Sequence, residues 1–373
     1  MSHGRPPAAV DVVVVGAGLA GLTAADALHA AGLSVAVIEG RPSIGGRIKT
    51  LAEDHAWFDL GATWHWSNQP RIRCLAAELG MEAFPQYRHG QAVAEDTAGV
   101  PPTLVDLPPP SPAELRFAGG AQALCHRLAA RLPLGTVSVD TDAVAVAASD
   151  GGVSVSVVDT AGEETQLSGG FAVVAVPPRL AFAAITFTPD LPAAVREVMQ
   201  ATPTWMATAV KCIAVYESPF WRDAGRSGLA FSRVGPLIEV HDGCTDDGST
   251  AALWGFLSAN HAVRDLDVER RRDAVFVQLG RMFGPEAADP VRYIERDWSN
   301  DPYTNDEVVW LGDPVAYGHP ALAQPLFDGR LLWAGTETAE VGGGHMEGAV
   351  RSGQRAAAQV LAFGKGVGRG PSE

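Results

Sequence analysis

The sequence of 373 residues lacks any long uninterrupted apolar stretch, although hydrophobic residues make up 47% of it. A membrane-spanning helix needs about 20 consecutive apolar residues, so the sequence predicts no transmembrane segment and no membrane partner. Residues 1–10 also lack the apolar segment and the cleavage site of a secretory signal. We therefore expect a cytoplasmic protein.

Cysteine is scarce, and the few cysteines are widely separated. The sequence holds only Cys74, Cys125, Cys212 and Cys244. They form no C-x-x-C pair and have no histidine nearby at metal-ligand spacing, so the sequence predicts no metal site. Isolated cysteines of this kind are typical of buried free thiols in a reducing compartment.

Positive charge is also scarce, because 28 Lys and Arg stand against 43 Asp and Glu and give a net charge of -15. A surface with this balance repels phosphate backbones, which excludes nucleic acid as a partner. The same field would attract a cationic substrate, although an acidic surface also serves solubility alone.

A glycine-rich turn follows an apolar strand near the N-terminus. The strand covers 11–15 and the turn contains Gly16, Gly18 and Gly21 at the start of a helix. A second strand, 34–38, ends at Glu39. Backbone amides at such a helix N-terminus bind a pyrophosphate, and an acidic residue after the second strand accepts hydrogen bonds from a ribose. Together these features predict a dinucleotide site.

Two further segments distinguish between the dinucleotides. The segment RPSIGGR covers 41–47, and DLGATWHW covers 59–66. A nicotinamide cofactor leaves between turnovers and needs no additional glycine-rich segment, whereas a permanently held flavin benefits from one. The candidate FAD-binding residues in these segments are Arg41, Gly46, Arg47, Gly61, Ala62 and Thr63.

These segments, with LRFAGGAQAL (115–124) and LLWAGTETAEVGGGHMEGAVRSGQRAA (331–357), resemble the flavin-containing monoamine oxidase family over most of the chain. The resemblance implies that Gly335, Thr336 and Glu337 lie near the ribityl chain and pyrophosphate. It also places the backbone amide of Met346 against the flavin ring and the backbone of Ala143 against adenine. A helix N-terminus suits the electron-rich end of a reduced flavin.

Lys211 is the leading catalytic candidate, because it resembles the family's lysine that holds a water against flavin N5. It stands in the middle of the apolar strand 209–216. An ammonium buried there costs several kcal/mol unless a neighbour uses it. The alternative is a lysine on an edge strand whose side chain reaches solvent.

The chain departs from the family at three places. Glu307 stands where the flavin-linking cysteine would be, Val308 replaces the first of two aromatic residues that flank the flavin, and His345 replaces the second. We therefore expect non-covalent FAD. His345 is a candidate base or substrate contact, or only a space-filling side chain. The segment 64–66 (Trp-His-Trp) offers another aromatic wall, or part of the core.

The substrate lid is also reduced. Relatives carry a helical insertion where this chain has only a proline-rich connector, 101–114, which can be neither helix nor central strand. We expect an open active site that admits a large amine, or one completed by a partner chain. The residues allow a homodimer without predicting one.

The predicted fold is α/β, with a Rossmann-type FAD-binding domain interleaved with a mixed α+β substrate domain whose helical part is shortened. The FAD-binding domain takes residues 1–100, with some substrate-lobe residues, 115–180 and 326–364. The substrate domain takes 181–325, and residues 365–373 form a disordered tail.

The leading functional prediction is an oxidase that transfers a hydride from the carbon beside an amine nitrogen to FAD, with O2 as electron acceptor. The substrate is a small amine or an amino acid. An L-amino-acid oxidase would need a cation for the substrate carboxylate, for which the candidates are Arg71, Arg73, Arg88 and Arg179. The same scaffold could also serve a carbon-carbon dehydrogenase or desaturase, or a flavin-binding protein without catalytic activity.

Overall fold

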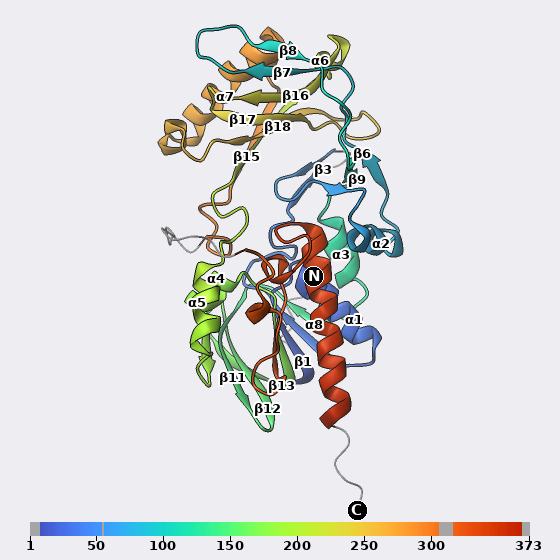
Figure 1. Ribbon diagram of the computed structural model, residues 1–373, viewed down its shortest axis with the longest axis vertical. Coiled ribbons are helices and arrows are strands. Elements are labelled where there is room, and N and C mark those ends of the chain that lie inside the picture. Colours follow the sequence, from blue (N-terminus) through green and yellow to red (C-terminus); the bar gives the residue numbers. More distant parts are fainter. Residues whose placement is uncertain (1–7, 54–55, 306–315, 368–373) are drawn as a thin grey trace, which may run out of the picture.

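The computed structural model describes residues 8–53, 56–305 and 316–367. The molecule is elongated, with one large β-sheet towards each end and smaller strands between them (Figure 1). Among the described residues, no helix has the length and apolar character needed to cross a membrane.

The first sheet has eight strands in the order β10-β2-β1-β13-β12-β11-β14, with β20 also pairing with β13. The strands are β1 (Ala9–Val15), β2 (Val35–Ile38), β10 (Val137–Ser138), β11 (Thr141–Ser149), β12 (Gly152–Asp159), β13 (Glu164–Val174), β14 (Thr186–Thr188) and β20 (Leu331–Trp333). The strands β10, β2, β1, β13 and β20 are mutually parallel, which is the arrangement expected of a dinucleotide-binding sheet.

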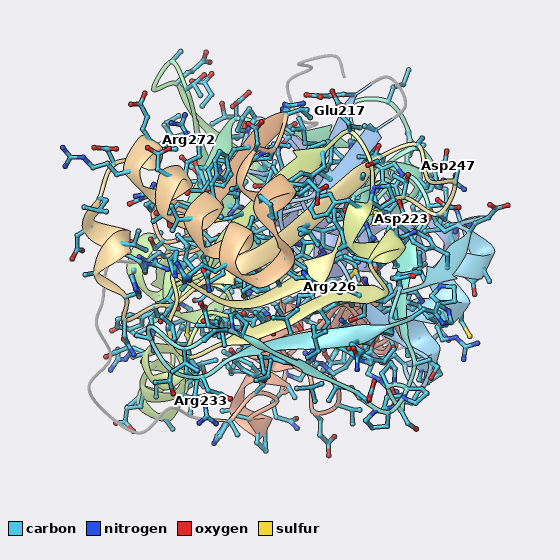
Figure 2. All side chains as sticks on the ribbon, turned by 90° about the horizontal axis from the view of Figure 1, so that it is seen from above. Glu217, Asp223, Arg226, Arg233, Asp247 and Arg272 are labelled. Atoms are coloured by element: carbon cyan, nitrogen blue, oxygen red, sulfur yellow. The ribbon has the colours of Figure 1, made fainter. Side chains whose placement is uncertain are left out.

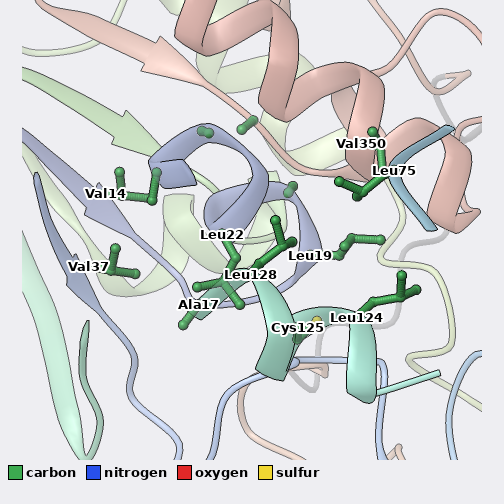
Figure 3. Close-up of a cluster of buried hydrophobic side chains, with 14 of the residues drawn as sticks. Val14, Ala17, Leu19, Leu22, Val37, Leu75, Leu124, Cys125, Leu128 and Val350 are labelled. Carbon is green, nitrogen blue, oxygen red and sulfur yellow. The ribbon is translucent and has the colours of Figure 1, made fainter. Parts of the chain in front are cut away.

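Helices cover both faces of this sheet. The helices α1 (Leu19–Ala30), α3 (Ala123–Ala129) and α8 (Met346–Val367) share one buried cluster, shown in Figure 3. The helices α4 (Pro178–Ala184) and α5 (Ala193–Ala201) share the other. Alternate residues of β1 enter the two clusters, with Val14 in the first and Val13 in the second. The strand is therefore apolar throughout, because it is buried on both faces.

The second sheet has seven strands in the order β19-β15-β18-β17-β16-β7-β8. They are β7 (Gln91–Glu95), β8 (Thr103–Val105), β15 (Val210–Tyr216), β16 (Arg226–Ser232), β17 (Leu237–Asp242), β18 (Ala251–Leu257) and β19 (Arg292–Asp297). Figure 2 shows α7 (Val268–Phe283) lying across these strands. Val275 and Leu279 of α7 pack against this face of the sheet. On the opposite face of the sheet, Ile213 and Trp254 pack against Phe58 and Leu60.

Shorter elements connect the two sheets. They are β3 (Thr50–Glu53), β4 (Ala56–Asp59), β5 (His65–Trp66), α2 (Pro70–Glu78), β6 (Ala83–Pro85) and β9 (Glu114–Phe117). The short helix α6 (Phe220–Asp223) packs on β16 of the second sheet (Figure 1). The four 3-10 turns are η1 (Ala262–Asp265), η2 (Pro285–Ala288), η3 (Pro320–Leu322) and η4 (Thr336–Thr338).

Three details differ from the sequence prediction. The strand β14 joins the first sheet by pairing with β11, although 181–325 is predicted as substrate domain. The proline-rich connector contributes β8 to the second sheet, at its edge, where proline is tolerated. The helix α8 continues to Val367, so the predicted tail begins too early.

The four cysteines are all free, as predicted. Cys74 is exposed, however, and only the other three are buried. The prediction of a buried thiol is therefore wrong for Cys74, which lies on the polar surface of the short helix α2.

Candidate active site

A cavity of about 740 Å³ lies between the carboxyl ends of the parallel strands and the face of the second sheet opposite α7. Ligand cavities in proteins commonly have volumes of this size. Most of the predicted site residues line it, namely Gly16, Gly18, Glu39, Arg41, Gly46, Arg47, Gly61, Ala62, Thr63, Ala143, Gly335, His345 and Met346. Gly21, Lys211 and Glu337 lie behind this lining. Residues far apart in the sequence thus meet at one site.

Two glycines of the turn, Gly21 and Gly18, are needed for different reasons. A Cβ on Gly21 would lie 1.9 Å from the Gly16 oxygen, so this position must be glycine for α1 to pack on the turn. A Cβ on Gly18 would meet only the Gly45 oxygen, at 4.0 Å, and would otherwise project into open space. Gly18 is the residue before α1 and lines the cavity, so its missing side chain leaves room for a phosphate beside the helix N-terminus.

Glu39 lies at the end of β2 and is buried. Its carboxylate accepts hydrogen bonds from the amides of Ala17, at 2.8 Å, and Arg41, at 3.1 Å. Burial raises the pKa of the Glu39 carboxyl, although these contacts oppose the effect. The Arg41 guanidinium lies 3.7 Å from the Glu39 carboxylate, and it also binds Asp301, at 2.7 Å, and donates to Thr304. The Glu39 carboxylate can therefore accept hydrogen bonds from a ribose. Arg41 mainly connects the segment after β2 to Asp301 and Thr304.

Arg47 and Glu337 form an ion pair beneath the cavity wall. Both nitrogens of the Arg47 fork reach the two carboxylate oxygens of Glu337, which is fully buried. Arg47 also donates to the carbonyl oxygen of Trp205 at 3.0 Å. A buried carboxylate is stable only when it is paired in this way. The pair joins the segment 41–47 to the segment after β20.

Lys211 lies in β15, between β18 and β19, and only 1% of it is exposed. The alternative of an edge-strand lysine that reaches solvent is therefore wrong. Its Nζ donates to the hydroxyl of Thr63 and, at 3.2 Å, to the carbonyl oxygen of Gly61. Because Thr63 lines the cavity, Lys211 acts on the cavity wall through that residue.

The surroundings of Lys211 disfavour its charged form. Burial lowers the pKa of the Lys211 ammonium to about 7, although the nearby carboxylate of Asp59 opposes this shift. The Nζ also lies 3.9 Å from the centre of the Trp254 ring. Burial raises the pKa of the Asp59 carboxyl. An amine with a pKa near neutrality can exchange a proton at physiological pH.

Aromatic side chains line the cavity from several segments. They are Trp64, Trp66, Trp205, Trp254, Phe256 and Tyr303. His345 is exposed and lies between Trp66 and Trp205, with ring centres 5.0 and 6.2 Å away. Trp64 and Trp66 therefore form part of a wall, whereas His65 between them stacks on Phe117 inside the protein. Glu307 and Val308 lie outside the described residues.

One carboxylate on the cavity wall was not expected from the sequence. Glu239 of β17 lines the cavity beside Trp254 and Phe256. Burial opposes its ionisation, but His241 and the nearby cations Arg88 and Lys211 outweigh burial and lower the pKa of the Glu239 carboxyl. The wall therefore carries a negative charge at neutral pH. Glu239 lies opposite Phe256 in the sheet, and Phe256 lies opposite Lys211, so this row crosses three strands.

The arginines proposed to bind a substrate carboxylate do not line the cavity. Arg88 is bound to Glu114, and Arg73 donates to the carbonyl oxygen of Ser67. Arg71 contacts Gln354, and Arg179 contacts the carbonyl oxygen of Gln200. The only arginines on the described cavity wall are Arg41 and Arg47, and each already has a buried carboxylate partner.

The cavity suits a cofactor that is bound without a covalent link. All four cysteines belong to the described residues, and none of them lines the cavity. Two helices, α1 and α8, begin at the cavity, so their N-terminal amides can face an anionic group. Within the described ranges, no group of three or more His, Cys, Asp or Glu is arranged to bind a metal ion.

Comparison with known proteins agrees with this geometry. The family model described as flavin containing amine oxidoreductase matches residues 19–117 and 110–361. A putrescine oxidase from Kocuria rosea is 28% identical, with 96% of this chain and 96% of the relative covered. That alignment runs over 463 positions although this chain has only 373 residues, so the chain carries deletions. The two family matches meet at 110–117, close to the proline-rich connector.

Solved structures extend the likeness to the fold. A putrescine oxidase with putrescine bound superposes with a TM-score of 0.80 at 25% identity, covering 95% of this chain and 99% of that one. Cyclohexylamine oxidase from Brevibacterium oxydans IH-35A gives a TM-score of 0.84 at 22% identity, covering 96% and 100%, and supports the fold alone. The chain therefore belongs to the flavin-containing amine oxidoreductase family, as an oxidoreductase that acts on amines with FAD as its cofactor.

Proposed function

We propose that the chain oxidises a primary amine that carries a second positive charge, with O2 as electron acceptor. The observation that carries this proposal is the ionised carboxylate of Glu239 on the cavity wall. A carboxylate in a partly buried, apolar surrounding binds an ammonium strongly, because the charges are poorly screened. The net charge of -15 also favours the approach of a cation. Putrescine, the ligand of the similar putrescine oxidase structure, is a diamine of this type.

An amino-acid substrate fits the same wall poorly. Glu239 would repel the substrate carboxylate, and the arginines available to neutralise it point elsewhere or are already paired. A carbon-carbon dehydrogenase would have no use for a carboxylate at this position. The geometry therefore favours the amine over both of these substrate classes.

FAD would be held by the segments that carry the family resemblance. Gly16 and Gly18 would accommodate the pyrophosphate, and Glu39 would accept hydrogen bonds from the adenosine ribose. Gly335 would lie near the ribityl chain and pyrophosphate, and Met346 would lie towards the ring. When bound, FAD would supply the oxidising power, as the acceptor of a hydride from the carbon beside the amine nitrogen. The protein binds and orients the amine and excludes competing reactions.

Replacement of Gly18 by alanine tests this cradle. Gly18 has φ -75°, and a new Cβ would meet nothing closer than 4.0 Å, so we expect the apoprotein to keep its melting temperature. Because the methyl group would project towards the phosphates, FAD affinity should fall at least about tenfold, which corresponds to about 1.4 kcal/mol. Fluorescence titration of apoprotein with FAD measures this.

Gly151→Ala is the matched control, because a Cβ there would meet only the Ser149 hydroxyl at 3.8 Å, in a turn outside the cavity. It should bind FAD like the unaltered protein. If both variants bind FAD with equal affinity, Gly18 does not contribute to the cofactor site.

The visible spectrum tests the function itself. Under anaerobic conditions, 1,4-diaminobutane should bleach the flavin absorbance at a lower concentration than butylamine, and L-amino acids should not bleach it. Admission of O2 should restore the spectrum and release peroxide. In Lys211→Met we expect bleaching to persist and the return of absorbance in air to slow, since the buried amine behind Thr63 would be lost. Bleaching by amino acids alone would contradict the proposed substrate class.

Part of the cavity lining is exposed to solvent. Trp205, which lines the cavity, is 49% exposed, and Phe231, which lies outside the lining, is 48% exposed. Phe231 lies directly opposite Glu239 in the sheet, so apolar surface continues past the carboxylate. The reduced lid expected from the sequence supports acceptance of amines longer than the cavity. A linear triamine should therefore be oxidised with a KM no higher than that of 1,4-diaminobutane.

A further inference from the structure

His241 stands behind Glu239 in a position that its packing fixes. It lies two residues further along β17, and only 4% of its side chain is exposed. Its ring packs against both Trp64 and Trp254, with each ring centre 4.6 Å away, and the two tryptophan rings also contact each other at 4.7 Å. A polar ring in such an apolar slot needs partners for both nitrogens.

The partner of one nitrogen determines the tautomer. Arg88 Nη1 lies 3.1 Å from His241 Nδ1. A guanidinium has only donors, so Nδ1 must accept and carries no proton. The proton of the neutral ring is then on Nε2. The Arg88 Nε donates to the Glu114 carboxylate of β9 at 2.9 Å. Glu114 therefore orients the Arg88 guanidinium.

The other nitrogen faces Glu239. Within the described structure His241 Nε2 is buried without a hydrogen-bond partner, and the acceptor that it faces, Glu239 Oε2, lies 3.5 Å away. The Glu239 side chain is 31% exposed and lines the cavity, while its Oε2 faces the histidine. Burial lowers the pKa of the His241 imidazole, although Glu239 opposes this, so the ring stays a neutral donor. Lys211 is the further charged group whose field reaches Glu239.

We propose that His241 is a positioning residue for substrate specificity, whose Nε2–H holds the Glu239 carboxylate in place to receive the second cation of the substrate. This inference rests on the proposed function of Glu239. Arg88 and Glu114 act one step further back, by fixing the tautomer that makes His241 a donor. Nothing in this arrangement touches the reacting atoms, so its effect falls on binding rather than on chemistry.

The alternative is that His241 only fills space between two tryptophans. Two substitutions separate the roles. In His241→Gln, the side-chain amide can donate from about the Nε2 position, whereas His241→Phe keeps the ring volume and loses both nitrogens. Flavin content and melting temperature, measured on the holoenzymes, check that both variants fold.

With 1,4-diaminobutane, His241→Phe should raise KM about tenfold with kcat nearly unchanged, and His241→Gln should stay within about threefold of the original enzyme. Butylamine, which has no second cation, should show KM values within about twofold in all three proteins. Equal losses in His241→Gln and His241→Phe, or equal losses with both amines, would overturn the positioning role.

A readout without turnover separates this inference from the proposed function. In holoenzyme with 15N-labelled histidine, NMR should show His241 protonated on Nε2 and not on Nδ1 between pH 6 and 9, and Arg88→Met should abolish this preference. The Nδ1–H tautomer in the unaltered enzyme would sink the inference even if diamines are oxidised. If Glu239→Gln leaves the diamine KM unchanged, the proposed role of Glu239 fails, whatever the tautomer.

Discussion

Replacing Glu239 with glutamine is expected to reduce kcat/KM for 1,4-diaminobutane by about 100-fold, which corresponds to about 2.7 kcal/mol. The side chain keeps its size and loses its charge, so the second ammonium of the substrate loses its charged partner. Hydrogen bonds to charged groups contribute about 1.5–3 kcal/mol when they are shielded from water, as on this apolar wall. Most of the loss should appear in KM, measured by steady-state peroxide release.

Butylamine provides the internal control, because it has no second ammonium and should lose less than about threefold in kcat/KM. Glu82→Gln is the matched protein control, since Glu82 is exposed and does not line the cavity. If Glu239→Gln has normal flavin content and its kcat/KM falls equally for both amines, Glu239 does not bind the second ammonium of the substrate.

The cofactor half of the site could be predicted from the sequence because its chemistry is local. A glycine turn between strand and helix needs only neighbouring residues to form, and Glu39 ends the adjacent strand. The parallel pairing of β1 and β2 then brings turn and carboxylate together. Segments such as 41–47 and 331–357 are long enough to identify their shared ligand.

The substrate half could not be predicted in the same way. Glu239 and His241 belong to a strand whose alternating pattern, IEVHD, is typical of a half-exposed sheet. Their role depends on β17 lying beside β18 and on Arg88 arriving from another segment. Neither of these long-range contacts produces a residue spacing that can be recognised in the sequence. Trp64 and Trp66 were expected as an aromatic wall, but Trp205 and Trp254 were missed because they come from separate elements.

Lys211 could be identified from the sequence, but its surroundings could not. The sequence indicated an ammonium in an apolar strand, and the structure explains how the strand accommodates it. The side chain is enclosed by Trp254, Thr63 and Gly61, and burial lowers its pKa from 10.5 to about 7. A charge removed from water without a close carboxylate partner is costly, so the neutral form becomes accessible near physiological pH.

This shift makes stability depend on pH in a defined window. Between pH 7 and 10.5 the unfolded chain binds a proton at Lys211 that the folded chain does not bind, so raising the pH stabilises the folded protein. The contribution is about 1.4 kcal/mol per pH unit. In Lys211→Met the contribution is absent. The melting temperature of the original enzyme should therefore rise relative to that of Lys211→Met by roughly 2 °C per pH unit above pH 7.

Below pH 7 the lysine is protonated in both states, so the difference between the two melting temperatures should become constant. Loss of the hydrogen bonds to Thr63 and Gly61 adds an offset that does not vary with pH, and the slope is unaffected by it. Lys365→Met, at an exposed position in α8, is the control and should follow the original enzyme at every pH. Parallel curves for Lys211→Met and the original enzyme between pH 7 and 9.5 would mean that Lys211 stays charged in the fold, and a role for the neutral amine would have to be abandoned.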